Sequence, residues 1–200
     1  MRETALVADV YERLLRAYGP QGWWPGGDDP FRVIVGAILT QNTAWANVEK
    51  ALQRLLEADA LSIEGVRRLD EDALAELVRS SGYFRSKARK LKAFVRLVDE
   101  RFGGDVGALL ALPQEELRQQ LLECYGIGPE TADAIVLYAA GKPAFVIDAY
   151  TTRIADRVGL VPSHPTYDGY ARLFAESLPA EASVFGEYHA LLVEHGKKCC

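Results

Sequence analysis

The chain has 200 residues, of which 49% are hydrophobic and 26% are charged, and its formal net charge is −5. A chain of this length and hydrophobic content can bury a sizeable core, as one large domain or two small lobes. No apolar stretch approaches the roughly 20 residues that span a bilayer, and the N-terminus is amphipathic rather than a signal peptide. We therefore expect a cytoplasmic, nucleoid-associated protein with no membrane partner.

The spacing of apolar residues predicts helices almost throughout and little or no sheet. Glycines and prolines separate the helices, as at Gly19-Pro20 and Gly103-Gly104. There is no internal repeat, low-complexity tract or flexible linker that would separate independent domains. The expected helices are residues 3–18, 30–40, 44–57, 70–79, 85–101, 105–111, 114–124, 130–140, 148–157, 167–177 and 182–194.

Seven basic residues and no acidic one lie between Arg79 and Val98. If residues 85–98 are helical, four of the seven share one face, and Leu91, Phe94 and Val98 form the buried stripe. That face is either simply solvated or contacts nucleic-acid phosphates, although the negative net charge argues mildly against such a partner. The four residues are Arg85, Arg89, Lys92 and Arg96.

Residues 126–131, Gly-Ile-Gly-Pro-Glu-Thr, separate two helix-compatible segments. Gly126 and Gly128 can adopt backbone conformations closed to other residues, and Pro129 suits the first turn of a helix. We expect a helix, a tight hairpin and a second helix, whose outward N–H groups can bind DNA phosphates without reading base sequence. The candidate backbone-binding residues are Gly126, Ile127, Gly128 and Thr131, together with Arg85, Lys87 and Arg89 from the basic run.

Several segments, in this order, resemble the endonuclease III superfamily of helix-hairpin-helix (HhH-GPD) DNA glycosylases. They are Leu39-Thr40-Gln41-Asn42-Thr43, the Gly126-Ile127-Gly128 hairpin, the Thr-Ala-Asp-Ala-Ile-Val-Leu helix that starts at Thr131, and the Ile-Asp-Ala-Tyr-Thr-Thr-Arg segment with Asp148. The likeness runs from about Trp23 to the C-terminus. It implies a monomeric base-excision-repair N-glycosylase that flips a damaged base out of duplex DNA and removes it.

The resemblance also implies an all-α fold with two helical lobes flanking a DNA-binding cleft. The lobe that carries the helix-hairpin-helix motif is expected at residues 28–140, with the motif at about 115–140. The second lobe combines residues 1–27 with residues 141–200.

Asp148 is the catalytic residue that the resemblance implies. Breaking the bond between a base and its sugar generates positive charge on the sugar, which a fixed carboxylate can stabilise while it orients the attacking water. The simpler interpretation is a helix N-cap, because Asp148 precedes an expected helix. Both roles are compatible with one another.

Glu130 stands where bifunctional members of the superfamily carry a lysine. That lysine forms a Schiff base and allows strand cleavage, which a carboxylate cannot do. The sequence therefore favours a monofunctional enzyme that uses water. Two alternatives stay open: an endonuclease III-type oxidised-pyrimidine glycosylase with abasic-site lyase activity, and a non-catalytic module that binds damaged DNA.

Aromatic residues suggest the class of base that is removed. Trp23, Trp24, Pro25 and Trp45 resemble the base pocket of the 3-methyladenine glycosylase branch, and such rings attract a cationic alkylated purine. The alternative is that these tryptophans belong to the core. Gln41 falls where the superfamily fills the gap left by the flipped base, and its amide can meet the orphaned partner base.

The cysteines bear on a cofactor. Residues 195–200, His-Gly-Lys-Lys-Cys-Cys, resemble the approach to the [4Fe–4S] motif of many endonuclease III-like proteins, with Cys200 as its first ligand. Cluster binding normally takes four cysteine thiolates, and the other three are absent. We expect no cofactor in the chain as given, and a [4Fe–4S] cluster only if the parent chain continues into that motif.

Overall fold

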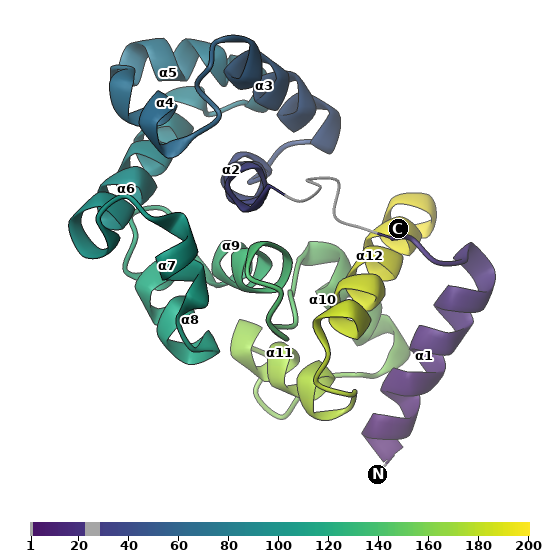
Figure 1. Ribbon diagram of the computed structural model, residues 1–200. Helices are drawn as coiled ribbons and strands as arrows, with labels where there is room; N and C mark the ends of the chain where they lie inside the picture. The colour runs from purple at the N-terminus through teal and green to yellow at the C-terminus, as the bar shows by residue number, and fades with distance from the viewer. Residues whose placement is uncertain (1, 23–28) are drawn as a thin grey trace. The chain divides into compact units, whose positions relative to one another are not determined.

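The computed structural model describes residues 2–22 and 29–200, and this part of the chain consists of helices and loops with no strand (Figure 1). The all-α prediction is confirmed. None of the helices in these residues is both long and apolar enough to cross a bilayer. In chain order the helices are α1 (Arg2–Tyr18), α2 (Pro30–Leu39), α3 (Trp45–Glu57), α4 (Ile63–Arg68), α5 (Glu71–Leu77), η1 (Arg79–Ser81), α6 (Phe84–Phe102), α7 (Val106–Ala111), α8 (Gln114–Leu122), α9 (Pro129–Ala134), η2 (Ile135–Ala139), α10 (Ala149–Val158), α11 (Tyr167–Glu176) and α12 (Ala182–Cys199).

The chain divides into two compact units. Unit 1 combines Met1–Trp24 with Val136–Cys200, and unit 2 is Pro25–Ile135. Both chain ends therefore contribute to unit 1, whereas unit 2 is one continuous segment. The sequence placed these changes of unit near residues 27 and 140.

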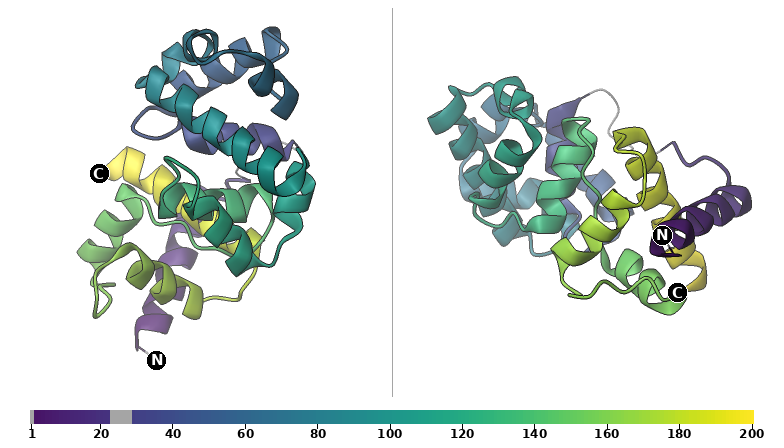
Figure 2. Two further views of the ribbon diagram at one scale, coloured as in Figure 1. Left: turned by 90° about the vertical axis from the view of Figure 1, so that its left-hand side faces the viewer. Right: turned by 90° about the horizontal axis from the view of Figure 1, so that it is seen from below.

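Unit 2 is built around α2. Asp29 caps this helix by accepting a hydrogen bond from the Phe31 N–H at 3.0 Å, and Pro30 occupies its first turn. Eight of its ten residues are buried, so α2 is a core helix that packs against α3, α6 and α9. The long helix α6 in turn packs against α4, α5 and α7 (Figure 2).

The apolar stripe predicted along α6 is confirmed. Leu91, Phe94 and Val98 are each at most 1% exposed. They place the opposite side of α6, with its basic residues, toward α4, α5 and solvent.

Unit 1 packs α12 against both α1 and α10. Its core contains an aromatic cluster in which the Phe145 and Phe174 rings stack with their centroids 4.5 Å apart, and Tyr188 meets Phe145 edge-on at 5.7 Å. Phe145 lies in the extended segment before α10, so its packing fixes the point at which Asp148 begins that helix.

Two local features differ from the sequence prediction. The short helix α4 was not predicted, although Ser62 caps it by accepting a hydrogen bond from the Gly65 N–H at 3.0 Å. Helix α12 continues past the predicted end at residue 194 to Cys199. Gly196 lies within the helix, and the Tyr150 ring of α10 occupies the space that a Cβ would need, so this glycine allows close packing rather than ending the helix.

Candidate functional site

The predicted hairpin lies between α8 and α9 in unit 2. Gly126 has φ of 81°, a left-handed conformation that favours glycine, and the Ile127 N–H donates to the Cys124 carbonyl at 3.1 Å. The Ile127 side chain is buried, whereas Gly128 is exposed. The hairpin thus anchors one side chain in the core and presents backbone to solvent.

An ion pair braces the two helices of this motif. The Arg118 Nε of α8 lies 2.7 Å from Oδ1 of Asp133 on α9, and the Asp133 side chain is only 5% exposed. Because the pair is largely buried, a substitution that removes one partner would leave an unpaired charge and destabilise the fold. It therefore holds α8 and α9 together beneath the exposed loop.

Gln41 is tied to the hairpin by its side-chain amide. Its Nε2 donates to the Gly126 carbonyl at 3.1 Å and to the Thr131 hydroxyl at 2.9 Å. Its Oε1 accepts from the Lys90 ammonium, and the Lys90 stem covers Gly126 where a Cβ would lie. Thr131 is buried, so its hydroxyl supports the hairpin from inside. For Gln41 to fill a gap in DNA, as predicted, it must first release these contacts.

A small hollow lies beside Gln41 on unit 2. It is lined by Gln41, Asn42, Tyr83, Ser86, Lys87 and Lys90. Asn42 and Tyr83 have φ of 54° and 45°, and such left-handed conformations are unfavourable for a tyrosine. The Tyr83 ring is 74% exposed. Backbone strain and an exposed aromatic ring at one place are typical of a binding surface.

Lys87 differs from its predicted role. The side chain is 1% exposed, and its Nζ donates to the Leu39 carbonyl at 2.8 Å and the Ser81 carbonyl at 2.5 Å. Burial, together with the positive charge of Lys90, lowers the pKa of Lys87 to about 8. Lys87 therefore supports two backbone carbonyls inside unit 2, with its side chain almost wholly buried at the wall of the hollow.

The remaining basic residues of α6 are largely paired within unit 2. Arg85 lies 3.2 Å from Asp72, and Arg89 lies 3.5 Å from Glu71, which are both α5 carboxylates. These exposed pairs leave both arginines accessible, but they offset the positive charge.

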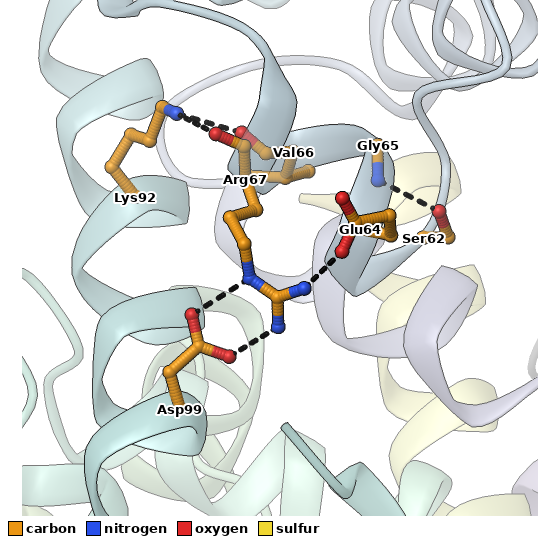
Figure 3. Close-up of polar contacts among 7 residues, drawn as sticks. All are labelled: Ser62, Glu64, Gly65, Val66, Arg67, Lys92 and Asp99. Carbon is orange, nitrogen blue, oxygen red and sulfur yellow. Dashed lines mark hydrogen bonds and ion pairs between the residues drawn. The ribbon is translucent and has the colours of Figure 1, made fainter. Parts of the chain in front are cut away.

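Lys92 holds the end of α4, as Figure 3 shows. Its Nζ donates to the carbonyls of Val66 at 2.7 Å and Arg67 at 3.1 Å, where a positive charge also favours the helix C-terminus. Arg67 in turn makes a two-pronged contact with Asp99 of α6. The basic face predicted for α6 therefore serves in part to attach α4.

Asp148 lies at the start of α10 in unit 1. Its Oδ1 accepts a hydrogen bond from the Thr151 N–H at 2.7 Å, so the residue caps the helix as its position suggested. Its Oδ2 lies 3.8 Å from Nε2 of His189 on α12, and the carboxylate is 17% exposed. The Nδ1 of His189 lies 2.7 Å from the Tyr138 hydroxyl.

The charge state of Asp148 follows from these neighbours. Burial raises the pKa of Asp148, whereas His189 and the Thr151 hydrogen bonds lower it. The lowering effects together outweigh burial, so the pKa of Asp148 lies below its ordinary value. Burial also raises the pKa of the Tyr138 hydroxyl, so this group stays neutral. The site thus holds a partly buried carboxylate in its ionised form.

The other predicted positions are placed as follows. Glu130 is exposed in the first turn of α9, and Trp45 is half-buried at the start of α3. Trp23, Trp24 and Pro25 lie outside the described residues.

The cysteines do not by themselves form a cluster site. Cys124 is buried, which raises its pKa to about 11, whereas Cys199 and Cys200 are exposed. Among residues 2–22 and 29–200, no three His, Cys, Asp or Glu side chains group as ligands of a metal ion. The residues present thus do not supply the four thiolates of a [4Fe–4S] cluster.

His189 and Tyr83 were not singled out in the sequence. His189 stands in the segment Tyr-His-Ala-Leu-Leu, where a histidine among apolar residues of a buried helix is a usable signal. Tyr83 follows Gly82 directly before a helix, and nothing in its own sequence context indicates a left-handed conformation.

Comparison with known proteins gives consistent results. A family described as HhH-GPD superfamily base excision DNA repair protein matches residues 35–180. MJ1434 of Methanocaldococcus jannaschii, named as a candidate DNA repair glycosylase, is 41% identical over 98% of this chain and 89% of its own length. Endonuclease III of Thermotoga maritima is 31% identical over 86% of this chain and 75% of its own length.

Solved structures share the fold over nearly the whole chain. The 3-methyladenine DNA glycosylase MagIII of H. pylori, bound to 1,N6-ethenoadenine, has a TM-score of 0.82 and 25% identity, and the match covers 99% of this chain and 98% of MagIII. A non-covalent complex of endonuclease III with DNA has a TM-score of 0.83 and 19% identity, covering 98% of this chain and 87% of that one. The second match is a likeness of fold alone.

Proposed function

Because this chain belongs to the HhH-GPD superfamily of base excision DNA repair proteins, we propose that it is a monofunctional N-glycosylase that releases alkylated bases from duplex DNA. It is a DNA repair glycosylase of this superfamily, as the resemblance in its sequence predicted. The observation that carries the proposal is Asp148, a partly buried carboxylate held in its ionised form.

Asp148 supplies the charge that the reaction needs. As the base leaves, the sugar develops positive charge, and an ionised carboxylate stabilises that charge most effectively where water is largely excluded. Thr151 holds one carboxylate oxygen at 2.7 Å. The other oxygen, Oδ2, is in our proposal the one that faces the sugar and the attacking water.

Glu130 supports the monofunctional mode. A carboxylate at the position of the superfamily's lysine cannot form the covalent Schiff base that leads to strand cleavage. The abasic product is therefore expected to keep an intact strand.

Two observations bear on the substrate. An alkylated purine is supported by the fit to MagIII over both whole chains, and by the resemblance of Trp23, Trp24, Pro25 and Trp45 in the sequence to the 3-methyladenine glycosylase branch. An alkylated purine already carries positive charge, so it leaves without strong acid catalysis. The 31% identity with Thermotoga maritima endonuclease III favours the second candidate, an oxidised-pyrimidine glycosylase with lyase activity.

We assign duplex DNA to a continuous surface of unit 2. Gly128 is exposed, Gly126 lies beside the Lys90 stem, and Lys90 shares its hollow with Gln41 and Tyr83. Backbone N–H groups, an ammonium and an exposed ring together suit phosphates and unstacked bases. Arg85 and Arg89 are weaker candidates because acidic partners offset their charge.

The test uses two duplexes of identical sequence, one carrying a methylated purine and the other an oxidised pyrimidine. We expect free base from the methylated duplex, and strand breaks only after alkaline treatment. Strand breaks without alkali, with an enzyme–DNA adduct trapped by borohydride, would establish the lyase instead. Binding without release from either duplex would establish the non-catalytic module.

A further inference from the structure

Three side chains from separate elements of unit 1 form a chain of contacts that ends on Asp148. The Tyr138 hydroxyl of η2 lies 2.7 Å from Nδ1 of His189, and Nε2 of His189 lies 3.8 Å from Oδ2 of Asp148. Tyr138 stands in a π-helical turn, a local irregularity that is frequent at functional sites. His189 is 5% exposed, so solvent does not orient its ring.

We propose that His189 is the positioning residue for the Asp148 carboxylate, and that Tyr138 sets the tautomer of His189. This inference rests on the proposed function, in which Asp148 is the catalytic residue.

The Tyr138 contact decides which ring nitrogen carries the proton. A neutral imidazole has one N–H donor and one acceptor nitrogen. The Tyr138 hydroxyl also lies 3.4 Å from the Gly186 carbonyl, a longer contact than the 2.7 Å to Nδ1, and it has only one proton to donate. In our proposal that proton goes to Nδ1, so the proton of His189 stands on Nε2, the nitrogen that faces Asp148. The opposite tautomer would turn a lone pair toward the carboxylate and repel it.

The distance between His189 and Asp148 suits orientation rather than neutralisation. At 3.8 Å the Nε2–Oδ2 separation exceeds a hydrogen bond, so the attraction is electrostatic and Oδ2 keeps capacity for another partner. Thr151 meanwhile holds Oδ1 at 2.7 Å. The Thr151 hydrogen bond thus fixes Oδ1, and the attraction of His189 orients Oδ2. In the proposed reaction the carboxylate must keep this orientation to face the sugar as its positive charge develops.

The ionisable groups around His189 come from several elements. Tyr138 belongs to η2, Asp148 stands before α10, and Glu187 of α12 acts on the Tyr138 hydroxyl. Tyr11 of α1 also lies within the influence of Glu187. Among these groups, Asp148 is the one whose ionisation the reaction requires, so a change at His189 must be read from the acid side of the rate profile.

The test measures single-turnover base release against pH for His189→Ala, His189→Gln and Tyr138→Phe, on the damaged duplex that the wild type cleaves. For His189→Ala we expect a rate about tenfold lower at neutral pH. We also expect its acid limb to move up by about one pH unit, because the variant loses the contribution of His189 that lowers the pKa of Asp148, while burial still raises it. His189→Gln should recover part of the rate, since its amide can donate toward Oδ2, and Tyr138→Phe should show a smaller shift in the same direction.

Unchanged pH profiles in His189→Gln and Tyr138→Phe would overturn the inference, even if their melting temperatures fall, because a merely structural role predicts that result. Asp148→Asn separates this failure from failure of the proposed function. If Asp148→Asn is inactive while the His189 and Tyr138 variants keep the wild-type profile, only the positioning role falls. If Asp148→Asn is fully active, the assignment of Asp148 falls first.

Discussion

Lys87 in unit 2 and Asp148 in unit 1 are two ionisable side chains that are held in opposite ways. Lys87 in unit 2 is 1% exposed and donates to two backbone carbonyls, and the positive charge of Lys90 acts against its own charge. Asp148 in unit 1 is 17% exposed and faces donors from Thr151 and His189. Burial opposes the charge in both, but only Asp148 has neighbours that restore it.

The different pKa shifts of the two side chains distinguish a residue that supports the fold, Lys87, from a candidate catalytic residue, Asp148. The pKa of Lys87 falls to about 8, toward the neutral amine, and a neutral amine still has two N–H groups for its two carbonyls. The pKa of Asp148 falls below its ordinary value, toward the ionised form that the reaction uses. Asp148 is the candidate for catalysis because its pKa is set by burial together with a specific partner, His189, and its ionised form is the one that the reaction uses.

The largest effect on stability is expected from Lys87→Met. The change removes the donors of the Leu39 and Ser81 carbonyls, and each buried unpaired carbonyl costs about 1–3 kcal/mol. We expect the free energy of unfolding to fall by about 2 kcal/mol at pH 7, measured by urea denaturation, because loss of the buried charge offsets part of the cost. An unchanged free energy of unfolding would show that the hydrogen bonds of Lys87 to the two carbonyls do not stabilise the fold.

The same variant has a pH signature. Lys87 has a folded pKa of about 8 and an ordinary value of 10.5, so between these pH values the unfolded chain holds a proton that the folded chain has lost. The free energy of unfolding then rises with pH in the wild type. The difference between wild type and Lys87→Met should therefore widen between pH 8 and 10.5, by up to about 3 kcal/mol. A constant difference would contradict the lowered pKa.

An intermediate effect is expected at the hairpin, where two glycines separate support from binding. Gly126→Ala forces a left-handed alanine and displaces the Lys90 stem, so we expect a loss of about 1–2 kcal/mol in stability and weaker DNA binding. A Cβ at Gly128 meets no atom within 4 Å. Gly128→Ala should thus nearly preserve stability while its methyl group hinders the DNA backbone, as measured by fluorescence anisotropy. Equal affinities for Gly128→Ala and wild type would remove the hairpin from the DNA surface.

The smallest effect is expected at the basic face of α6. Arg85→Ala and Arg89→Ala should each lower DNA affinity by less than about threefold, because Asp72 and Glu71 already offset their charge. Asp72→Asn is the matched control and should slightly strengthen binding. A tenfold loss of DNA affinity in either arginine variant would instead support the prediction from the sequence that the basic face of α6 contacts DNA.

Local patterns predicted what local forces determine. The apolar stripe of α6, the glycine hairpin and the N-cap at Asp148 follow from residue types a few positions apart, and each is present. The prediction did not anticipate that α12 continues through Gly196, where the absence of a Cβ makes room for the Tyr150 ring of another helix. The sequence predicted Lys87 to be an exposed basic residue, because the two carbonyls that it contacts lie 6 and 48 positions away in the chain. His189 meets Asp148 through the packing of α12 on α10, which no spacing in the sequence expresses.

The most direct test of the account is single-turnover base release by Asp148→Asn beside its melting temperature. Asparagine caps a helix about as well as aspartate, so α10 and the folded state should be preserved. We expect the rate to fall by about a thousandfold, because the amide cannot stabilise the cationic sugar, with a melting temperature close to that of the wild type. A near-wild-type rate from a folded Asp148→Asn protein would contradict the account and leave Asp148 as a helix cap alone.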